Sequence, residues 1–310
     1  MLASAITKGE KMLVCPYCHK TLSKTEGAYL CVSCDEIFSQ NQYGYFTFLK
    51  QVPNFNEYEP YEEYAARQDQ AGKRQYYEYL ADFFYQQPFQ TVVDVGCGMG
   101  IGILELRKRS CEAYGVDLPL VSRFWAQRGY PQEFFFCADA TALPFPDDYF
   151  DIVYSMGVIE HIGTIGGHFS LRDDYQVLRR NYADELLRVA KPGGRILISC
   201  PNKSFPLDFQ HGALDDHMPR NIINLIRHYL YNKTKANIHQ TWGKYHLLSY
   251  REIGQLFKRP VEALPVKDFL GFSTISGKLA RRLAKSYFSH LPGFLRKTWV
   301  NPYVVALVIK

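Results

Sequence analysis

A predicted strand, a glycine-rich turn and a predicted helix follow one another at residues 91–107, in the segment TVVDVGCGMGIGILELR. Its first five residues have the largely apolar character of a strand buried on both faces, and apolar residues after the turn recur at helical spacing. Such a unit directs backbone N–H groups and a helix N-terminus at one point, where a nucleotide-like ligand can bind. The segment therefore predicts a parallel α/β sheet with a ligand at the carboxyl end of this strand.

The spacing of the glycines distinguishes between two kinds of ligand. A dinucleotide fingerprint, G-x-G-x-x-G beginning at Gly96, would need a glycine at position 101, where the chain has Ile101. The observed pattern is G-x-G-x-G, with Asp94 two residues before it. This pattern disfavours a dinucleotide, but a glycine-rich turn alone does not identify the ligand.

The alternation of strands and helices continues through the rest of the chain. A second strand ends in Asp117, about 20 residues after the glycine turn, where a carboxylate can accept hydrogen bonds from ribose hydroxyls. A third strand ends in Asp139. Further strands are predicted at residues 148–156, 194–200, 261–272 and 301–310. The sequence thus predicts a doubly wound, mostly parallel, seven-stranded sheet that binds its ligand at the carboxyl ends of the strands.

These motifs together resemble those of the class I S-adenosylmethionine (SAM) methyltransferases. The match rests on VVDVGCGMG, GVD, CADATALPFPDDYFDIVYSMGVIEHI and LLRVAKPGGRILIS, in the family's order and spacing, and covers about residues 75–200. The resemblance implies a Rossmann-like methyltransferase fold, an enzyme, and SAM as cofactor. It implies that the glycine turn surrounds the methionine part of SAM, that Asp117 binds the ribose hydroxyls, and that Asp139 with the Ala140 amide contacts the adenine edge. The implied cofactor-binding residues are Asp94, Gly96, Gly98, Gly100, Asp117, Asp139, Ala140 and Ser155.

The same resemblance implies that residues 155–161 face the transferred methyl group. His161 is the candidate general base, because the unperturbed pKa of histidine lies near neutrality; alternatively, it shapes the pocket without moving a proton. The segment lacks the Asp/Asn-Pro-Pro-aromatic motif of amino-directed nucleic-acid methyltransferases and the Pro-Cys nucleophile of pyrimidine-carbon enzymes. Neither absence excludes methylation of a ring nitrogen in RNA.

Four cysteines near the N-terminus form two C-x-x-C pairs separated by twelve residues. The first pair, C-P-Y-C, also occurs in glutaredoxin-like redox proteins, where a following helix lowers the thiol pKa. Here the stretch HKTLSKTEGAYL follows, with a glycine and no helical period. Two pairs supply the four thiolates of a structural zinc site. The predicted zinc ligands are Cys15, Cys18, Cys31 and Cys34.

This zinc ribbon is predicted to be a small module whose last strand, residues 43–49, alternates like an edge strand. So few residues cannot bury a core, so zinc would contribute the folding free energy. The module could recognise substrate or RNA, or it could be a structural cap on the next domain. The predicted organisation is a zinc ribbon at 1–50, a linker at 51–74, and a methyltransferase domain at 75–310 with insertions at about 203–246 and 273–300.

Composition and charge indicate the cellular compartment of the protein and the charge of a binding partner. The remaining cysteines are scattered through apolar stretches, as expected of buried thiols in a reducing compartment. The charged N-terminal stretch and the lack of a long apolar run predict a cytoplasmic protein. The net charge is −7 over residues 51–200 and +11 over residues 201–310, which indicates an anionic partner for the C-terminal third.

The C-terminal third contains a predicted amphipathic helix and several histidines. An apolar stripe, which includes Leu279 and Leu283, runs beside a basic stripe within residues 275–297. Such a helix could lie on an anionic membrane surface, contact RNA phosphates, or pack its apolar face on the core. Five histidines between residues 203 and 246 are interpreted as loop and pocket residues of an acceptor lid rather than as ligands of a second metal.

The function predicted from the sequence is methyl transfer from SAM to a small or lipid-linked biosynthetic metabolite, at oxygen, nitrogen or carbon. The predicted location is cytoplasmic, with peripheral membrane contact as an option. A ring-nitrogen guanine methyltransferase of ribosomal RNA is the first alternative, since such enzymes also pair a zinc ribbon with this fold. A catalytically silent scaffold with the SAM fold is the second alternative. The intact glycines and three acids disfavour it.

Overall fold

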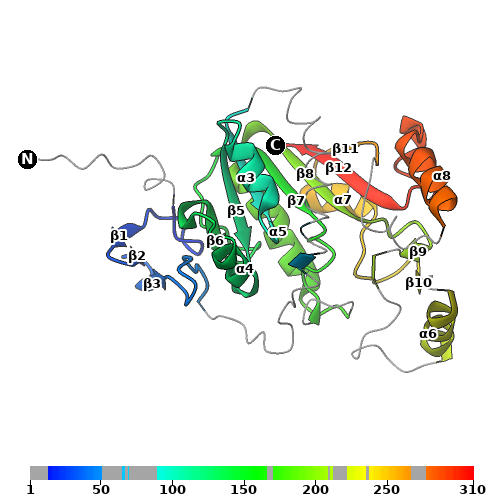
Figure 1. Ribbon diagram of the computed structural model, residues 1–310, viewed down its shortest axis with the longest axis horizontal. Coiled ribbons are helices and arrows are strands. Elements are labelled where there is room, and N and C mark those ends of the chain that lie inside the picture. Colours follow the sequence, from blue (N-terminus) through cyan, green and yellow to red (C-terminus); the bar gives the residue numbers. More distant parts are fainter. Residues whose placement is uncertain are drawn as a thin grey trace, which may run out of the picture.

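The computed structural model describes residues 13–50, 65–66, 69, 89–165, 170–208, 210–211, 222–234, 237–266 and 277–310. Its main feature is a seven-stranded sheet with the order β11-β12-β8-β7-β4-β5-β6 (Figure 1). The strands are β4 (Thr91–Val95), β5 (Glu112–Asp117), β6 (Phe135–Cys137), β7 (Phe150–Met156), β8 (Ala190–Pro201), β11 (Val261–Ala263) and β12 (Tyr303–Ile309). The doubly wound, mostly parallel sheet predicted from the sequence is confirmed.

The order of the strands creates a crevice beside β4. From β4 the chain adds the parallel strands β5 and β6 on one side, and then β7 and β8 on the other. The strand order therefore reverses between β4 and β7, where open α/β sheets bind their ligands. The last two strands differ in direction, since β12 is antiparallel to β8 and β11 is antiparallel to β12.

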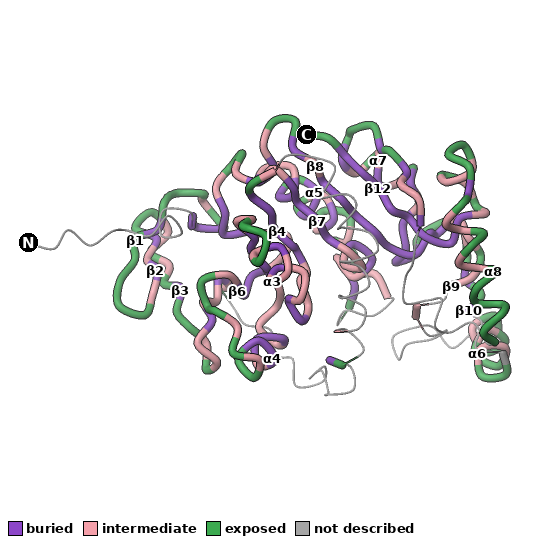
Figure 2. The backbone as a smooth tube through the Cα atoms, turned by 45° about the horizontal axis from the view of Figure 1, so that its top comes forward, coloured by how far each residue is buried: buried purple, intermediate pink, exposed green. Residues whose placement is uncertain are grey.

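Alternate residues of the strands enter two separate cores, one on each face of the sheet. Val93 and Val95 share a core with helices α5 (Tyr175–Val189) and α7 (Tyr250–Phe257). Val92 belongs to the other core, with the helices that follow β4 and β5. Those helices are α3 (Ile101–Arg107) and α4 (Ser122–Gln127). The strands are consequently buried along most of their length (Figure 2), as their apolar sequences predict.

The N-terminal module is a three-stranded antiparallel sheet of β1 (Ser23–Thr25), β2 (Ala28–Cys31) and β3 (Glu36–Ser39). In place of the edge strand predicted at residues 43–49, the segment forms two isolated bridges, one of them antiparallel between Phe46 and Gln40, just after β3. The second bridge is to the main sheet. There the Phe48 amide donates to the Cys137 carbonyl at 2.7 Å, and the Cys137 amide donates to the Phe46 carbonyl at 2.8 Å. The segment thus pairs with β6 and covers the edge of the main sheet, whose backbone groups would otherwise lack strand partners.

Aromatic packing joins the module to the core of the seven-stranded sheet. The ring of Phe48 lies 5.2 Å from that of Phe38 in the module and 6.1 Å from that of Phe136 in β6. The Val14 amide donates to the Pro144 carbonyl at 3.1 Å. Of the two interpretations left open by the sequence, this packing favours a structural cap. Nearly all of the predicted linker, residues 51–74, lies outside the described residues.

The C-terminal third adds elements around the end of β8. They are β9 (Leu207–Asp208), α6 (Ile222–Thr234), β10 (Asn237–Ile238) and α8 (Lys278–Ser289). Single helical turns occur at η3 (Pro119–Val121), η4 (Gln132–Phe134) and η7 (Gly293–Leu295). β9 pairs with β10 in a two-stranded sheet, which brings the segment after β8 back toward the crevice. Among the described residues, no helix is long and apolar enough to cross a membrane.

Candidate active site

A cavity of about 530 Å³ opens at the carboxyl ends of β4, β5, β6 and β7. This is the crevice that the strand order predicts. The cavity contains most of the site residues predicted from the sequence. Those that line it are Gly96, Gly98, Asp117, Asp139, Ala140 and His161.

Three predicted site residues support the cavity from behind its wall. Ser155 is fully buried, and its hydroxyl donates to the Val95 carbonyl at 2.6 Å, which ties β7 to β4. Asp94 is buried within β4, where burial raises its pKa well above the usual value. Gly100 begins α3 with a φ of 73°, and a Cβ there would lie 2.4 Å from the Phe135 ring.

The glycine turn needs glycine for two different reasons. Gly96 has a φ of 85°, and a Cβ there would lie 2.2 Å from a methyl carbon of Val158. Gly98 has a φ of 51°, but no atom lies within 4 Å of its Cβ position, so this glycine leaves space in the cavity. The Trp125 indole N–H donates to the Gly98 carbonyl at 2.7 Å and fixes the turn from α4. Sequence reasoning missed Trp125, because the contact joins segments 27 residues apart.

Asp117 is held at the end of β5 by two backbone amides. Its Oδ2 accepts from Gly98 N–H and its Oδ1 accepts from Leu118 N–H, each at 2.7 Å. Burial raises the pKa of Asp117 to about 6, and these two hydrogen bonds lower it in part. Each carboxylate oxygen has two acceptor lone pairs, so the side chain can still accept from ligand hydroxyls.

Asp139 follows β6 and lies in the cavity wall beside Ala140. Its Oδ1 accepts from both the amide and the hydroxyl of Thr141, each at 2.7 Å. These bonds set the orientation of the carboxylate in a tight turn, since the Ala142 amide also donates to the Asp139 carbonyl at 3.0 Å. The second oxygen can therefore face a ligand in a fixed direction.

The segment after β7 brings His161 to the cavity and places Glu160 behind it. Glu160 is fully buried, and burial raises its pKa to about 7. The His161 ring lies 5.3 Å from the ring of His211, and the His211 ring lies 5.1 Å from that of His246. Three histidines from distant segments are thus gathered at one end of the cavity.

Asp208 orients this group of histidines. Its Oδ2 lies 2.8 Å from Nδ1 of His211. Burial acts to lower the pKa of His211, but the charge and hydrogen bond of Asp208, together with the Glu160 charge, outweigh it and the pKa is raised. For His246, burial lowers the pKa well below its usual value. Sequence reasoning noted the histidines but did not connect them with Glu160 or Asp208, although the D-x-x-H spacing at 208–211 was a local signal.

The four N-terminal cysteines form a compact cluster. Sγ of Cys15 lies 3.9 Å from Sγ of Cys34, and Sγ of Cys18 lies 3.5 Å from Sγ of Cys31. All four sulfur atoms lie within 4.8 Å of one another. In a tetrahedral zinc–thiolate site, sulfur atoms are separated by about 3.8 Å, so the cluster fits a zinc ion. Nε2 of His19, in the first knuckle, lies 3.7 Å from Oε1 of Glu185, so the cluster lies close to helix α5.

Comparisons with known proteins agree with the predicted fold and cofactor. A family model described as a methyltransferase domain matches residues 93–198. A probable chloroplastic tocopherol O-methyltransferase of Oryza sativa subsp. japonica is 35% identical over 116 residues, which cover 35% of this chain and 28% of the relative. The phosphoethanolamine N-methyltransferase of Triticum aestivum is 32% identical over 125 residues, which cover 39% of this chain and 22% of the relative.

Among solved structures, a phosphoethanolamine N-methyltransferase 2 of Haemonchus contortus aligns with a TM-score of 0.47 and 18% identity. It covers 86% of this chain and 62% of that protein. The chain spans about a quarter of the length of the two curated plant relatives. Residues 93–198 therefore match a family described as a methyltransferase domain, in agreement with the class I SAM-dependent methyltransferase predicted from the sequence.

Proposed function

We propose that this chain transfers a methyl group from SAM to a small or lipid-linked biosynthetic metabolite. The observation that supports the proposal most is the cavity itself, in which Gly98, Asp117, Asp139 and His161 meet at the carboxyl ends of four strands. SAM, when bound, supplies a methyl group on a sulfonium centre, so the protein mainly has to orient the acceptor and remove its proton. A scaffold without activity would have no need of this arrangement.

The proposed cofactor contacts follow from the geometry of the wall. Gly98 and the turn around it would lie along the methionine part, because its Cβ position is open. Asp117 would accept hydrogen bonds from the ribose hydroxyls, and Asp139 with the Ala140 amide would contact the adenine edge. Asp94, Gly100 and Ser155 would act by holding this wall in place rather than by direct contact.

The acceptor would enter at the end of the cavity opposite the adenine contacts. That end is lined by residues that follow β7, together with Arg172 and Gln210. His161 lies there and is the proposed group that receives the acceptor's proton. Arg172 could contact an acidic group of an acceptor, although it also forms an ion pair with Asp174 at 2.7 Å.

The cysteine cluster is proposed to hold one structural zinc ion. With zinc bound, residues 13–50 would keep Phe48 packed against both Phe38 and Phe136 and so cover the edge of β6. The proposed boundaries remain a ribbon at 1–50, a linker at 51–74 and a methyltransferase domain at 75–310. This arrangement assigns the zinc ribbon a structural role, away from the acceptor.

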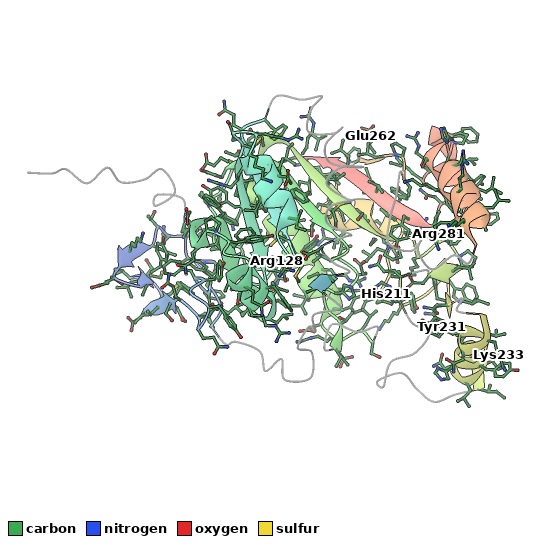
Figure 3. The ribbon with its side chains drawn as sticks, in the orientation of Figure 1. Arg128, His211, Tyr231, Lys233, Glu262 and Arg281 are labelled. Carbon is green, nitrogen blue, oxygen red and sulfur yellow. The ribbon has the colours of Figure 1, made fainter. Side chains whose placement is uncertain are left out.

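A membrane surface is the proposed source of a lipid-linked acceptor, and helix α8 supports it. Leu279, Leu283 and Tyr287 are 70%, 62% and 53% exposed, so this apolar stripe does not pack on the core. Ala284 and Phe288, on another side of the helix, pack against the core instead. The exposed stripe lies beside basic residues of α8, one of which is labelled in Figure 3, and this combination suits an anionic lipid surface. Ile275, the first residue of the predicted stripe, lies outside the described residues.

The deciding experiment supplies radiolabelled SAM to the purified protein with separate extracts of polar metabolites, lipids and RNA from the source cells. We expect label in the metabolite or lipid fraction. Label in RNA alone would support the ribosomal RNA alternative. No label in any fraction, together with no binding of S-adenosylhomocysteine by calorimetry, would contradict an enzymatic function.

Vesicle binding separates the three interpretations of α8. For membrane contact, wild type should bind vesicles that contain acidic lipid, and Leu283→Asp should weaken that binding without lowering the melting temperature. For RNA contact, Arg281→Ala with Arg282→Ala should reduce the RNA affinity and its dependence on salt, whereas Leu283→Asp should have no effect. A core-packed stripe would instead make Leu283→Asp destabilising. Salt-sensitive RNA binding without vesicle binding would refute membrane contact.

A further inference from the structure

The group of ionisable side chains beside the cavity has no assigned role beyond His161. Glu160 and His161 follow β7, Asp208 ends β9, and His211 lies three residues after Asp208 (labelled in Figure 3). Their donor atoms approach closely: one ligand atom from each of Glu160, His161 and His211 lies within 4.8 Å of the others. Two segments far apart in the sequence thus place two imidazoles and a carboxylate around one point.

Glu160 is the member of this group that most needs explanation. Its side chain is fully buried, and neither carboxylate oxygen has a hydrogen-bond partner in the described part of the chain. Burying a carboxylate costs several kcal/mol unless a cation or hydrogen bonds compensate it. Against the effect of burial, the charges of His211 and Arg179 act to lower the pKa of Glu160. The Arg179 guanidinium, however, donates its hydrogen bonds to the carbonyls of Ile162 and His246, at 3.1 and 2.5 Å.

His211 has the surroundings of an oriented metal ligand. Its Nδ1 lies 2.8 Å from Oδ2 of Asp208, and the other oxygen of Asp208 accepts from the amides of Gln210 and His211. A carboxylate that accepts from one ring nitrogen of a histidine fixes the tautomer, so the other nitrogen presents its lone pair. In His211 the nitrogen that bonds to Asp208 is Nδ1, so Nε2 is the nitrogen that can bind a metal ion.

We propose that Glu160, His161 and His211 bind one divalent transition-metal ion at the acceptor end of the cavity, with Asp208 as the positioning residue for His211. Two histidines and one carboxylate are a ligand set of catalytic zinc and non-haem iron sites, which keep further coordination positions open. His161 lines the cavity, so an open position would face the acceptor. An acceptor oxygen or nitrogen that coordinates there would release its proton more readily, to solvent, so that in the metal-bound form His161 would be a ligand and not the general base. Metal binding itself does not depend on the proposed function.

Cobalt titration of the full chain tests this site separately from the cysteine cluster. Protein stripped with a chelator is titrated with Co²⁺, and absorbance and equilibrium dialysis are followed together. Thiolate ligands give an intense charge-transfer band, whereas the proposed site has only nitrogen and oxygen donors. We expect two equivalents of Co²⁺ to bind tightly. The cysteines hold one of them and give the thiolate band, and the second binds without adding to that band.

The variants identify the ligands. Glu160→Gln and His211→Gln should each weaken the affinity of the non-thiolate equivalent at least tenfold, and Asp208→Asn should weaken it by about 10- to 100-fold. The matched control is His239→Gln, since His239 is a buried histidine nearby that stacks on Tyr245 and belongs to neither candidate ligand group. The His239→Gln variant should bind the non-thiolate Co²⁺ equivalent with the same affinity as wild type.

Folding is checked in every variant by its thermal melt and by the thiolate band of the cysteine site. If Glu160→Gln does not fold, His161→Gln serves instead, because His161 is only partly buried at the cavity wall. The proposal is overturned if wild type binds no equivalent beyond the thiolate site. It is also overturned if a folded Glu160→Gln or His161→Gln variant binds Co²⁺ as tightly as wild type.

Discussion

The raised pKa of Asp117 predicts that cofactor affinity depends on pH near 6. The carboxylate accepts two backbone hydrogen bonds at the end of β5, yet burial still raises its pKa to about 6. Only the ionised side chain can accept from both ribose hydroxyls without presenting a proton to them. Because the bound form requires the ionised state, affinity should be highest above pH 6 and should fall as the pH is lowered through this value.

The size of the effect follows from the fraction of Asp117 that is ionised. With a pKa of about 6, the side chain is about nine-tenths ionised at pH 7 and about one-tenth ionised at pH 5. If the protonated form binds negligibly, the dissociation constant should rise about tenfold between these values, which corresponds to about 1.4 kcal/mol. Asp117→Asn should bind more weakly at pH 7, by about 1–3 kcal/mol, and should lose this dependence on pH.

Calorimetric titration with S-adenosylhomocysteine between pH 5 and pH 7, with a chelator present, measures the effect. The other titratable groups facing Asp117 are Asp94 of β4, Cys97 of the glycine turn and Cys137 of β6. Burial raises the pKa of all three, so Asp94→Asn is the control that should keep the transition near pH 6. A flat profile in wild type, or the same pH dependence in Asp117→Asn, would refute the assignment of Asp117 to the ribose.

Three further predictions concern the zinc ribbon and the glycine turn. Cys31→Ser should release zinc, measured by metal analysis, and should unfold the ribbon; freshly purified, reduced wild type without zinc would contradict the site. Phe48→Ala should lower the free energy of unfolding in urea by about 3–5 kcal/mol because Phe48 is fully buried, whereas the exposed Val32→Ala should change it by less than about 0.5 kcal/mol. Gly100→Ala should destabilise by more than about 1 kcal/mol and by more than Gly129→Ala, since both have positive φ but only Gly100 would clash with a neighbouring ring. Equal losses of stability in Gly100→Ala and Gly129→Ala would contradict this prediction, because they would mean that the Phe135 ring moves to relieve the clash.

Much of the fold and of the candidate site could be predicted from the sequence, because these features depend on local patterns. A buried parallel strand is an apolar run, and the glycine turn after β4 requires residues that tolerate positive φ or close approach. The acids that end β5 and lie just beyond β6 reach the cavity because the carboxyl ends of parallel strands meet at one edge. For the same reason, the sequence alone indicates Gly96, Gly98, Asp117 and Asp139, and all four line the cavity.

Only the tertiary structure decided which residues meet across long separations. Residues 46–48 alternate like a strand of the ribbon and pair with it at Gln40, but they also pair with β6, because backbone pairing depends on which sheet edge lies nearby. The exposure of Leu283 could not be predicted either, since an amphipathic pattern is the same whether its apolar face meets a core, a membrane or solvent. The Glu160–His211 cluster is the clearest case. The sequence determines that these residues can ionise and bind a metal, but their approach depends on where β9 returns the chain after β8, and no local pattern encodes that distance.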